Sequence, residues 1–120
     1  MKELIGHTLT GLTLSDDQTI LTFHTTTGDV VYEAEGDCCS ESWFAYLLGD
    51  FTGEVIAVEK KEEREAEPSR QQVDAVYGYI LTIKEPFRGR IERADVELRN
   101  SSNGYYGGWC TYRKDLSQER

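Results

Sequence analysis

The sequence lacks any apolar run long enough to cross a bilayer, and its first residues lack the apolar block of a secretory signal. Cysteine is scarce, with Cys38 adjacent to Cys39 and Cys110 as the third, and this odd count does not suggest a disulfide framework. The chain has no Cys-x-x-Cys or His-x-x-x-His spacing and no phosphate-binding Walker loop. These absences predict a cytoplasmic protein without a membrane segment, a metal or another cofactor.

Basic residues are nearly missing from the first half of the chain. Residues 1–59 contain 11 Asp and Glu against Lys2 alone, whereas residues 60–120 contain 12 Lys and Arg against 11 acids, and the net charge is −9. An acidic half disfavours direct binding of nucleic acid and favours a basic protein partner, although the charge would also serve solubility alone. The candidate partner-binding residues are Asp16, Asp17, Asp29, Glu33, Glu35 and Glu41.

Short segments rich in β-branched and aromatic residues, separated by turn residues, predict an antiparallel sheet of six to seven strands. The strands are expected at residues 8–15, 19–25, 30–35, 54–59, 76–83, 91–101 and 105–113. Trp43, Phe44, Leu47 and Leu48 recur with helical spacing and predict one short helix packed on the sheet. The expected fold class is therefore α+β.

The organisation along the chain predicts a single domain over residues 1–120. Residues 60–72 have no apolar period and contain Pro68, so we expect a mobile charged loop there. Residues 116–120 are polar and are expected to fray.

The dipeptide Asn103-Gly104 indicates a two-residue hairpin turn, because a type I′ turn needs positive φ at both central positions. This turn would place Ser102 opposite Tyr105, Asn100 opposite Gly107 and Leu98 opposite Trp109. Asn100 would then face a residue without a side chain, which would leave space for a ligand. The expected site lies on this hairpin, over residues 99–109.

Two motifs together carry a resemblance: Gly36-Asp37-Cys38-Cys39-Ser40-x-Ser42-Trp43, and Arg99-Asn100-Ser101-Ser102-Asn103-Gly104-Tyr105-Tyr106. In this order they resemble a family of bacterial and phage proteins, the domain of unknown function DUF7448. The resemblance extends from Leu4 to Tyr112, apart from the charged loop near Pro68. It implies a small intracellular protein carried by phages or other mobile elements, and it transfers no catalytic residue.

Polar and aromatic side chains of these two motifs form the candidate ligand site. Tyr and Trp rings would stack on a base or sugar, and an Arg would pair with a phosphate or carboxylate, so a nucleotide-like anion is the expected ligand. The alternative is structural, with glycines permitting a close chain crossing and Asn and Ser capping a turn. The candidate residues are Arg99, Asn100, Ser102, Tyr105, Tyr106, Trp109, Asp37 and Ser40.

The leading functional expectation is a non-enzymatic acidic protein of phage or prophage origin. It would occupy a basic surface of a host protein that binds nucleic acid or serves in defence. A small-molecule binder or sponge using the 99–109 hairpin is the second hypothesis. A thiol or metal enzyme that uses the cysteines with His7 or His24 is the third. An exposed strand edge would also allow a homodimer.

Overall fold

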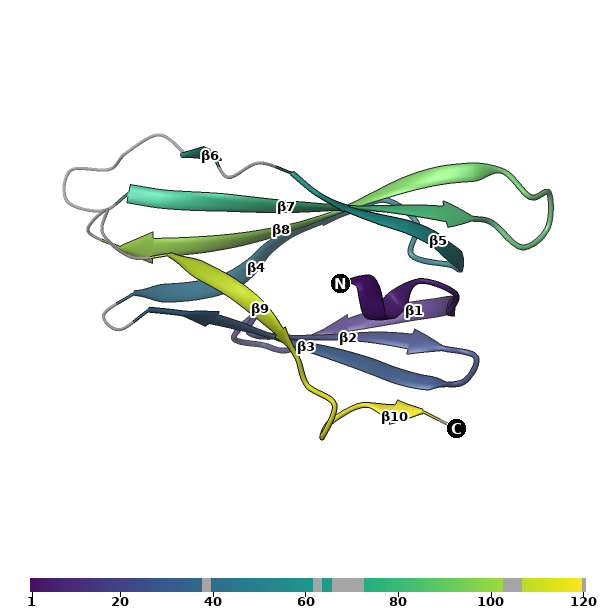
Figure 1. The fold of residues 1–120 in the computed structure, drawn as a ribbon, viewed down its shortest axis with the longest axis horizontal. Helices are drawn as coiled ribbons and strands as arrows, with labels where there is room; N and C mark the ends of the chain where they lie inside the picture. The colour runs from purple at the N-terminus through teal and green to yellow at the C-terminus, as the bar shows by residue number, and fades with distance from the viewer. Residues whose placement is uncertain (38–39, 62–63, 66–72, 103–106, 120) are drawn as a thin grey trace.

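A computed structural model describes residues 1–37, 40–61, 64–65, 73–102 and 107–119. These residues form one 3-10 turn and ten β-strands (Figure 1). The elements are η1 (Lys2–Leu4), β1 (Thr8–Leu14), β2 (Ile20–Thr25), β3 (Gly28–Gly36), β4 (Glu41–Leu48), β5 (Gly53–Lys60), β6 (Arg64–Glu65), β7 (Val73–Lys84), β8 (Ile91–Ser102), β9 (Gly108–Tyr112) and β10 (Gln118–Glu119).

All strand pairs are antiparallel, and the sheet runs in the order β10-β3-β2-β1-β5-β7-β8-β4, with β9 on β3 and β6 on β7. The sheet bends between β1 and β5, where only two residue pairs join the strands. The bend produces two layers, with β1, β2 and β3 in one and β5, β7 and β8 in the other (Figure 1). Gly53 at the bend has φ +126, and an added Cβ would lie 2.4 Å from the Lys84 carbonyl oxygen, so the bend requires a glycine.

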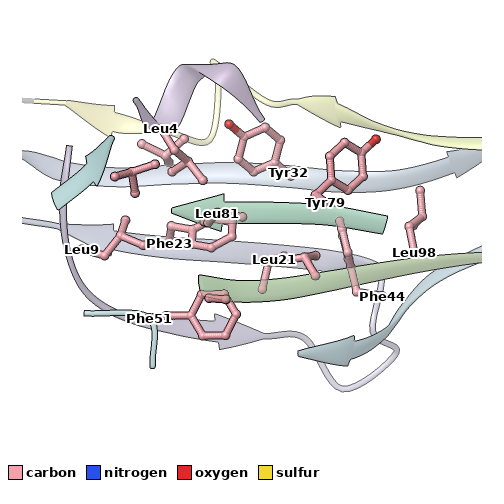
Figure 2. Packing of buried hydrophobic residues seen from close by; sticks show 14 of the residues in the cluster. Leu4, Leu9, Leu21, Phe23, Tyr32, Phe44, Phe51, Tyr79, Leu81 and Leu98 are labelled. Carbon is pink, nitrogen blue, oxygen red and sulfur yellow. The ribbon is translucent and has the colours of Figure 1, made fainter. Parts of the chain in front are cut away.

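The hydrophobic core lies between the two layers (Figure 2). Leu21 and Phe23 of β2 face it from one layer, and Leu81 of β7 and Leu98 of β8 face it from the other, all fully buried. Strand side chains alternate between the faces of a sheet, so a regular strand such as β7 contributes every second residue to this core. The predicted antiparallel arrangement is confirmed, but the sheet contains ten strands among the described residues instead of six to seven.

The predicted α+β class is wrong, because the segment expected to form the helix is strand β4. It pairs with β8, and the register shifts between Phe44 and Tyr46. This bulge brings both Phe44 and Leu47 to the core side, opposite Leu98 and Val96. An i, i+3 spacing of core residues therefore arises in a bulged strand, and it imitates the spacing of a helix. Among the described residues, η1 is the single helical segment.

The predicted pairing across the 99–109 hairpin is also wrong. β8 pairs with β4 and β7, whereas β9 pairs with β3, so Trp109 lies opposite Glu35 and Gly108 opposite Gly36. β8 and β9 are therefore not paired with each other. The proposed turn at residues 103–104 lies outside the described residues.

Two expected flexible segments contain short strands. Within 60–72, Arg64–Glu65 form β6 and pair with β7, while residues 62–63 and 66–72 lie outside the described part of the chain. Within 116–120, Gln118–Glu119 form β10 and pair with Gly28 and Asp29 of β3. No helix in the described ranges is long and apolar enough to cross a membrane.

Candidate functional site

Asn100 of β8 is the centre of a buried polar cluster. Its side chain is 0% exposed, and its Nδ2 donates hydrogen bonds to Ser40 Oγ at 3.0 Å and Ser42 Oγ at 2.8 Å. Ser40 Oγ donates in turn to the Asp37 carbonyl oxygen at 2.6 Å. The Asn100 Oδ1 atom has no hydrogen-bond partner among the described residues. The cluster joins β8 to β4 and to the end of β3.

Glycines bring β3 and β9 against this cluster. A Cβ on Gly36 would lie 2.7 Å from Asn100 Nδ2, and a Cβ on Gly108 would lie 2.4 Å from Ser42 Oγ. The backbone N–H of Gly107 donates to Asp37 Oδ2 at 3.0 Å. The space expected beside Asn100 is therefore filled by serine side chains and glycine backbone, so this arrangement stabilises a chain crossing.

Two of the other candidate ligand residues, Arg99 and Trp109, do not converge on Asn100. Arg99 lies on the opposite face of β8, between Trp43 of β4 and Val76 of β7. Trp109 is 42% exposed, and its Nε1 donates to Glu35 Oε2 at 3.2 Å. Tyr105 and Tyr106 lie outside the described residues, and the side chain of Ser102 is not described either. Of the candidate set, the structure brings together Asp37, Ser40 and Asn100.

Four of the six acidic candidates are engaged within the protein. Asp17 Oδ1 accepts hydrogen bonds from Ser15 Oγ and from the backbone N–H and Oγ1 of Thr19, which lower the pKa of this exposed carboxyl. Asp29 Oδ1 lies 2.9 Å from His24 Nδ1, and Glu33 Oε2 lies 2.6 Å from Arg113 Nη1. Glu35 Oε2 accepts from Trp109 Nε1 and from Thr111 Oγ1. These groups hold turns and strands together.

Asp16 and Glu41 are exposed, and their carboxylates have no hydrogen-bond or ion-pair partner within the described ranges. Both lie along β4: Glu41 begins it, and the turn that contains Asp16 contacts its middle through Gln18 and Phe44. β4 is the last strand in the sheet order. Its outer residues Tyr46 and Leu48 are 51% and 53% exposed. We call Asp16, Asp17, Glu41, Tyr46 and Leu48 the β4 flank.

A carboxylate, an imidazole and a hydroxyl form a chain on the outer surface of β1, β2 and β3. His24 Nδ1 lies 2.9 Å from Asp29 Oδ1, and His24 Nε2 lies 2.7 Å from Thr13 Oγ1. Acyl-transfer enzymes use this order of groups, but they also need oxyanion donors and a substrate pocket beside the hydroxyl. The pockets beside Cys110 and at the turn between β7 and β8 are lined by other residues. We therefore assign these hydrogen bonds to the stabilisation of neighbouring strands and not to catalysis.

The thiol hypothesis depends on three cysteines, of which Cys38 and Cys39 lie outside the described residues. Cys110 of β9 is a free thiol, and burial raises its pKa, with a hydrogen bond from Tyr79 opposing that shift. A raised pKa favours the protonated thiol, which is the weaker nucleophile. No group of three or more His, Cys, Asp or Glu in the described part of the chain could hold a metal ion.

A pocket of about 380 Å³ opens beside Cys110, between β5, β7, β3 and β9. Tyr32 and Tyr79 form buried walls, with side chains 1% and 7% exposed. Burial raises the pKa of both phenols well above the usual range, and the hydrogen bond from Tyr32 to Glu3 adds to the effect at Tyr32. Both phenols therefore stay protonated and act as hydrogen-bond donors at neutral pH.

Sequence reasoning missed this pocket, although two signals for it were present. Tyr79 lies in a segment, residues 76–83, in which both sets of alternating side chains are largely apolar, and a tyrosine in such a place needs a hydrogen-bond partner. The second signal is that Lys2 and Lys60 are the two basic residues among residues 1–60. Both line this pocket.

A second pocket, of about 370 Å³, lies at the turn between β7 and β8. Phe87 at this turn is 94% exposed. Glu85 holds the turn, because its carboxylate accepts hydrogen bonds from the backbone N–H groups of Phe87, Arg88 and Arg90. These bonds lower the pKa of Glu85 against the opposing effect of desolvation.

Comparison with known proteins places this fold in a family. Residues 2–111 match the family described as Domain of unknown function (DUF7448). A protein of Acanthamoeba polyphaga mimivirus, named Uncharacterized protein L278, is 36% identical over 87 residues, which cover 66% of this chain and 64% of the relative. The match therefore spans less than two thirds of that relative. No solved structure matches the chain. Because the family match covers most of the sequence, this chain belongs to the DUF7448 family.

Proposed function

We propose that this chain is a non-enzymatic binding protein that occupies a basic surface of a partner protein through the β4 flank. The observation that carries the proposal is the position of Asp16 and Glu41, which are exposed and unpaired within the described ranges beside one strand edge. Unpaired carboxylates attract a basic partner over a distance and orient its approach.

The composition of the β4 flank supports this proposal. An edge strand offers unpaired backbone groups to a partner, and exposed aromatic and aliphatic side chains contribute contact area. Tyr46 and Leu48 supply such area on β4 itself, and Tyr46 lies opposite Glu97 of β8. The other acidic candidates, Asp29, Glu33 and Glu35, are assigned to internal contacts instead.

Under this proposal the partner is a host protein with a basic surface, such as one that binds nucleic acid or acts in defence. A viral protein is among the relatives of this chain, and a phage or prophage origin of the chain belongs to the same proposal. The same strand edge would join two copies of the chain if it pairs with itself.

The test is quantitative capture of host proteins by the immobilised protein. The double variant Asp16→Asn with Glu41→Gln is compared with a control of equal charge change on β5, Glu54→Gln with Glu59→Gln, whose side chains are exposed on another strand. We expect the wild type and the control to retain basic host proteins. The variant Asp16→Asn with Glu41→Gln should fail to retain them, and raised salt should release them from the wild type. Equal capture by all three proteins would contradict the proposal. Light scattering at several concentrations reports self-association separately.

A further inference from the structure

The pocket beside Cys110 combines features of a small-molecule site and lies away from the β4 flank. Its volume of about 380 Å³ falls in the lower part of the range of ligand pockets, roughly 300–1,000 Å³. Aromatic rings line it, since Tyr32 and Tyr112 are in tilted contact with ring centroids 5.9 Å apart. Val58 adds an aliphatic wall. A flat apolar body of one or two rings would fit these walls.

The phenols of Tyr32 and Tyr79 point to the same side of the core, towards η1 and β9 (Figure 2). Tyr32 donates a hydrogen bond to Glu3 Oε1 at 2.9 Å, and the Tyr79 hydroxyl pairs with the Cys110 thiol. The Glu3 carboxylate of this pocket thus already accepts a hydrogen bond. It is less available to a ligand than the lysine side chains are.

Two lysines place positive charge at the mouth of the pocket, although basic residues are otherwise missing from the first 60 positions of the sequence. Lys2 and Lys60 are 58 positions apart and are the sole basic residues in the first 60, yet the fold places both at this pocket. The Lys60 Nζ lies 5.8 Å from the ring centroid of Tyr77 and 6.0 Å from that of Tyr79. Such contacts hold the ammonium in position. No carboxylate pairs with Lys60 in the described part of the chain.

We propose that this pocket binds a small aromatic anion, a molecule of one or two rings that carries a carboxylate, sulfonate or phosphate group. The rings lie between Tyr32, Tyr79 and Val58, and the anionic group faces Lys2 and Lys60. Charge-assisted contacts at the mouth then fix the orientation of the ligand, while the aromatic walls supply the buried area.

The probe for this proposal is 8-anilinonaphthalene-1-sulfonate, an aromatic anion whose fluorescence rises in apolar surroundings. We expect saturable binding of one dye per chain. The variant Lys60→Met keeps an aliphatic stem of similar length and removes the charge, so it should weaken dye affinity by about tenfold. The matched control is Lys61→Met, because Lys61 lies beside Gly78 and within 4.0 Å of Asp95, on the other side of the sheet.

A second readout uses the cysteine in the pocket. Bound dye should slow alkylation of Cys110 at least several-fold, measured by peptide mass mapping of the folded protein, and Val58→Trp should abolish both dye binding and this protection by filling the pocket. Thermal melting confirms that each variant is folded. If Val58→Trp does not fold, the Lys60→Met and Lys61→Met comparison decides the matter. Equal affinity in those two variants, or dye binding without protection of Cys110, would overturn the proposal.

Discussion

Gln18 and Phe44 exchange hydrogen bonds across the two layers of the fold. The Phe44 N–H donates to the Gln18 carbonyl oxygen at 2.8 Å, and Gln18 Nε2 donates to the Phe44 carbonyl oxygen at 3.0 Å. The pair attaches the turn between β1 and β2 to the free edge of β4. It also satisfies two backbone groups that an edge strand would otherwise leave open.

Two substitutions of Gln18 should separate the stability that its side-chain hydrogen bond contributes from the stability that its backbone conformation costs. Gln18 has φ 63, in the left-handed region that glycine adopts without strain. Gln18→Ala keeps that strain and loses the side-chain bond, so we expect a loss of about 1 kcal/mol in the free energy of unfolding. Gln18→Gly loses the same bond but relieves about 1 kcal/mol of strain, and it should be nearly neutral. Urea denaturation measures both.

Equal losses of stability in Gln18→Ala and Gln18→Gly would show that backbone strain at position 18 does not affect the free energy of unfolding. Two neutral variants would show that the bond to Phe44 contributes nothing to stability. The second result, but not the first, would mean that the Gln18 side chain does not attach the turn to the β4 edge in the way its hydrogen bond to Phe44 indicates.

Seven predicted strands correspond to observed ones, because their apolar residues alternate within segments bounded by turn residues. The failure at β4 has a definite cause. The bulge between Phe44 and Tyr46 displaces the alternation by one residue, so that Phe44 and Leu47 both face the core. A spacing of three is also the spacing of a helix, and eight residues are too few for the two patterns to differ. The partner strand β8 decides the outcome by supplying the backbone hydrogen bonds.

Some contacts between the candidate site residues were predictable, whereas others were not, for a similar reason. Local turn chemistry at Asn103-Gly104 indicates a reversal of the chain, but it carries no information on which strand β9 pairs with. β9 lies on β3, and this separates Trp109 from Asn100. The grouping of Asp37, Ser40 and Asn100 was expected from their motifs, whereas the contacts with Gly36 and Gly108 depend on tertiary structure.

The close approach of β9 to Asn100 predicts that Gly108→Ala is strongly destabilising. The new Cβ would lie 2.4 Å from Ser42 Oγ and 2.8 Å from Asn100 Cβ, so side chains or strands must move. Overpacking of this kind costs about 1–3 kcal/mol, and we expect a value in the upper part of that range. Gly107→Ala is the matched control, because its nearest contact is the Tyr77 hydroxyl at 3.0 Å, which is the far end of a side chain.

Denaturation by urea or heat compares these two alanine variants. The double variant Gly108→Ala with Ser42→Ala should recover part of the loss, since it removes the nearest clashing atom. A Gly108→Ala protein as stable as the wild type would mean that the crossing at Asn100 is looser than the structure indicates.

The hydrogen bonds at Asp17 predict a specific acid sensitivity. Ser15 and Thr19 lower the pKa of Asp17 in the folded protein. A group with a lowered folded pKa contributes stability above its unfolded value, about pH 4, and that contribution is lost as the pH falls through the folded pKa. Asp17→Asn should therefore lose less stability than the wild type between about pH 5 and about pH 2. Asp16→Asn serves as the matched control for the loss of one negative charge in the same turn.

Urea midpoints at several pH values within this window provide the measurement. If stability falls with pH to the same extent in Asp17→Asn and in the wild type, Asp17 has no role in the acid sensitivity, whatever the absolute stabilities of the two proteins.

The turn between β7 and β8 provides a test of local order without a change in the core. The Glu85 carboxylate accepts the N–H of Phe87 at 3.0 Å and of Arg90 at 3.4 Å, as well as that of Arg88. Glu85→Ala removes these bonds, so the turn should open more often and trypsin should cleave after Arg88 or Arg90 several-fold faster. Phe87→Ala should change the free energy of unfolding by less than about 0.5 kcal/mol, because the ring is 94% exposed. Glu92→Ala is the charge-matched control, and equal cleavage rates in both glutamate variants would rule out the Glu85 carboxylate as the group that orders the turn.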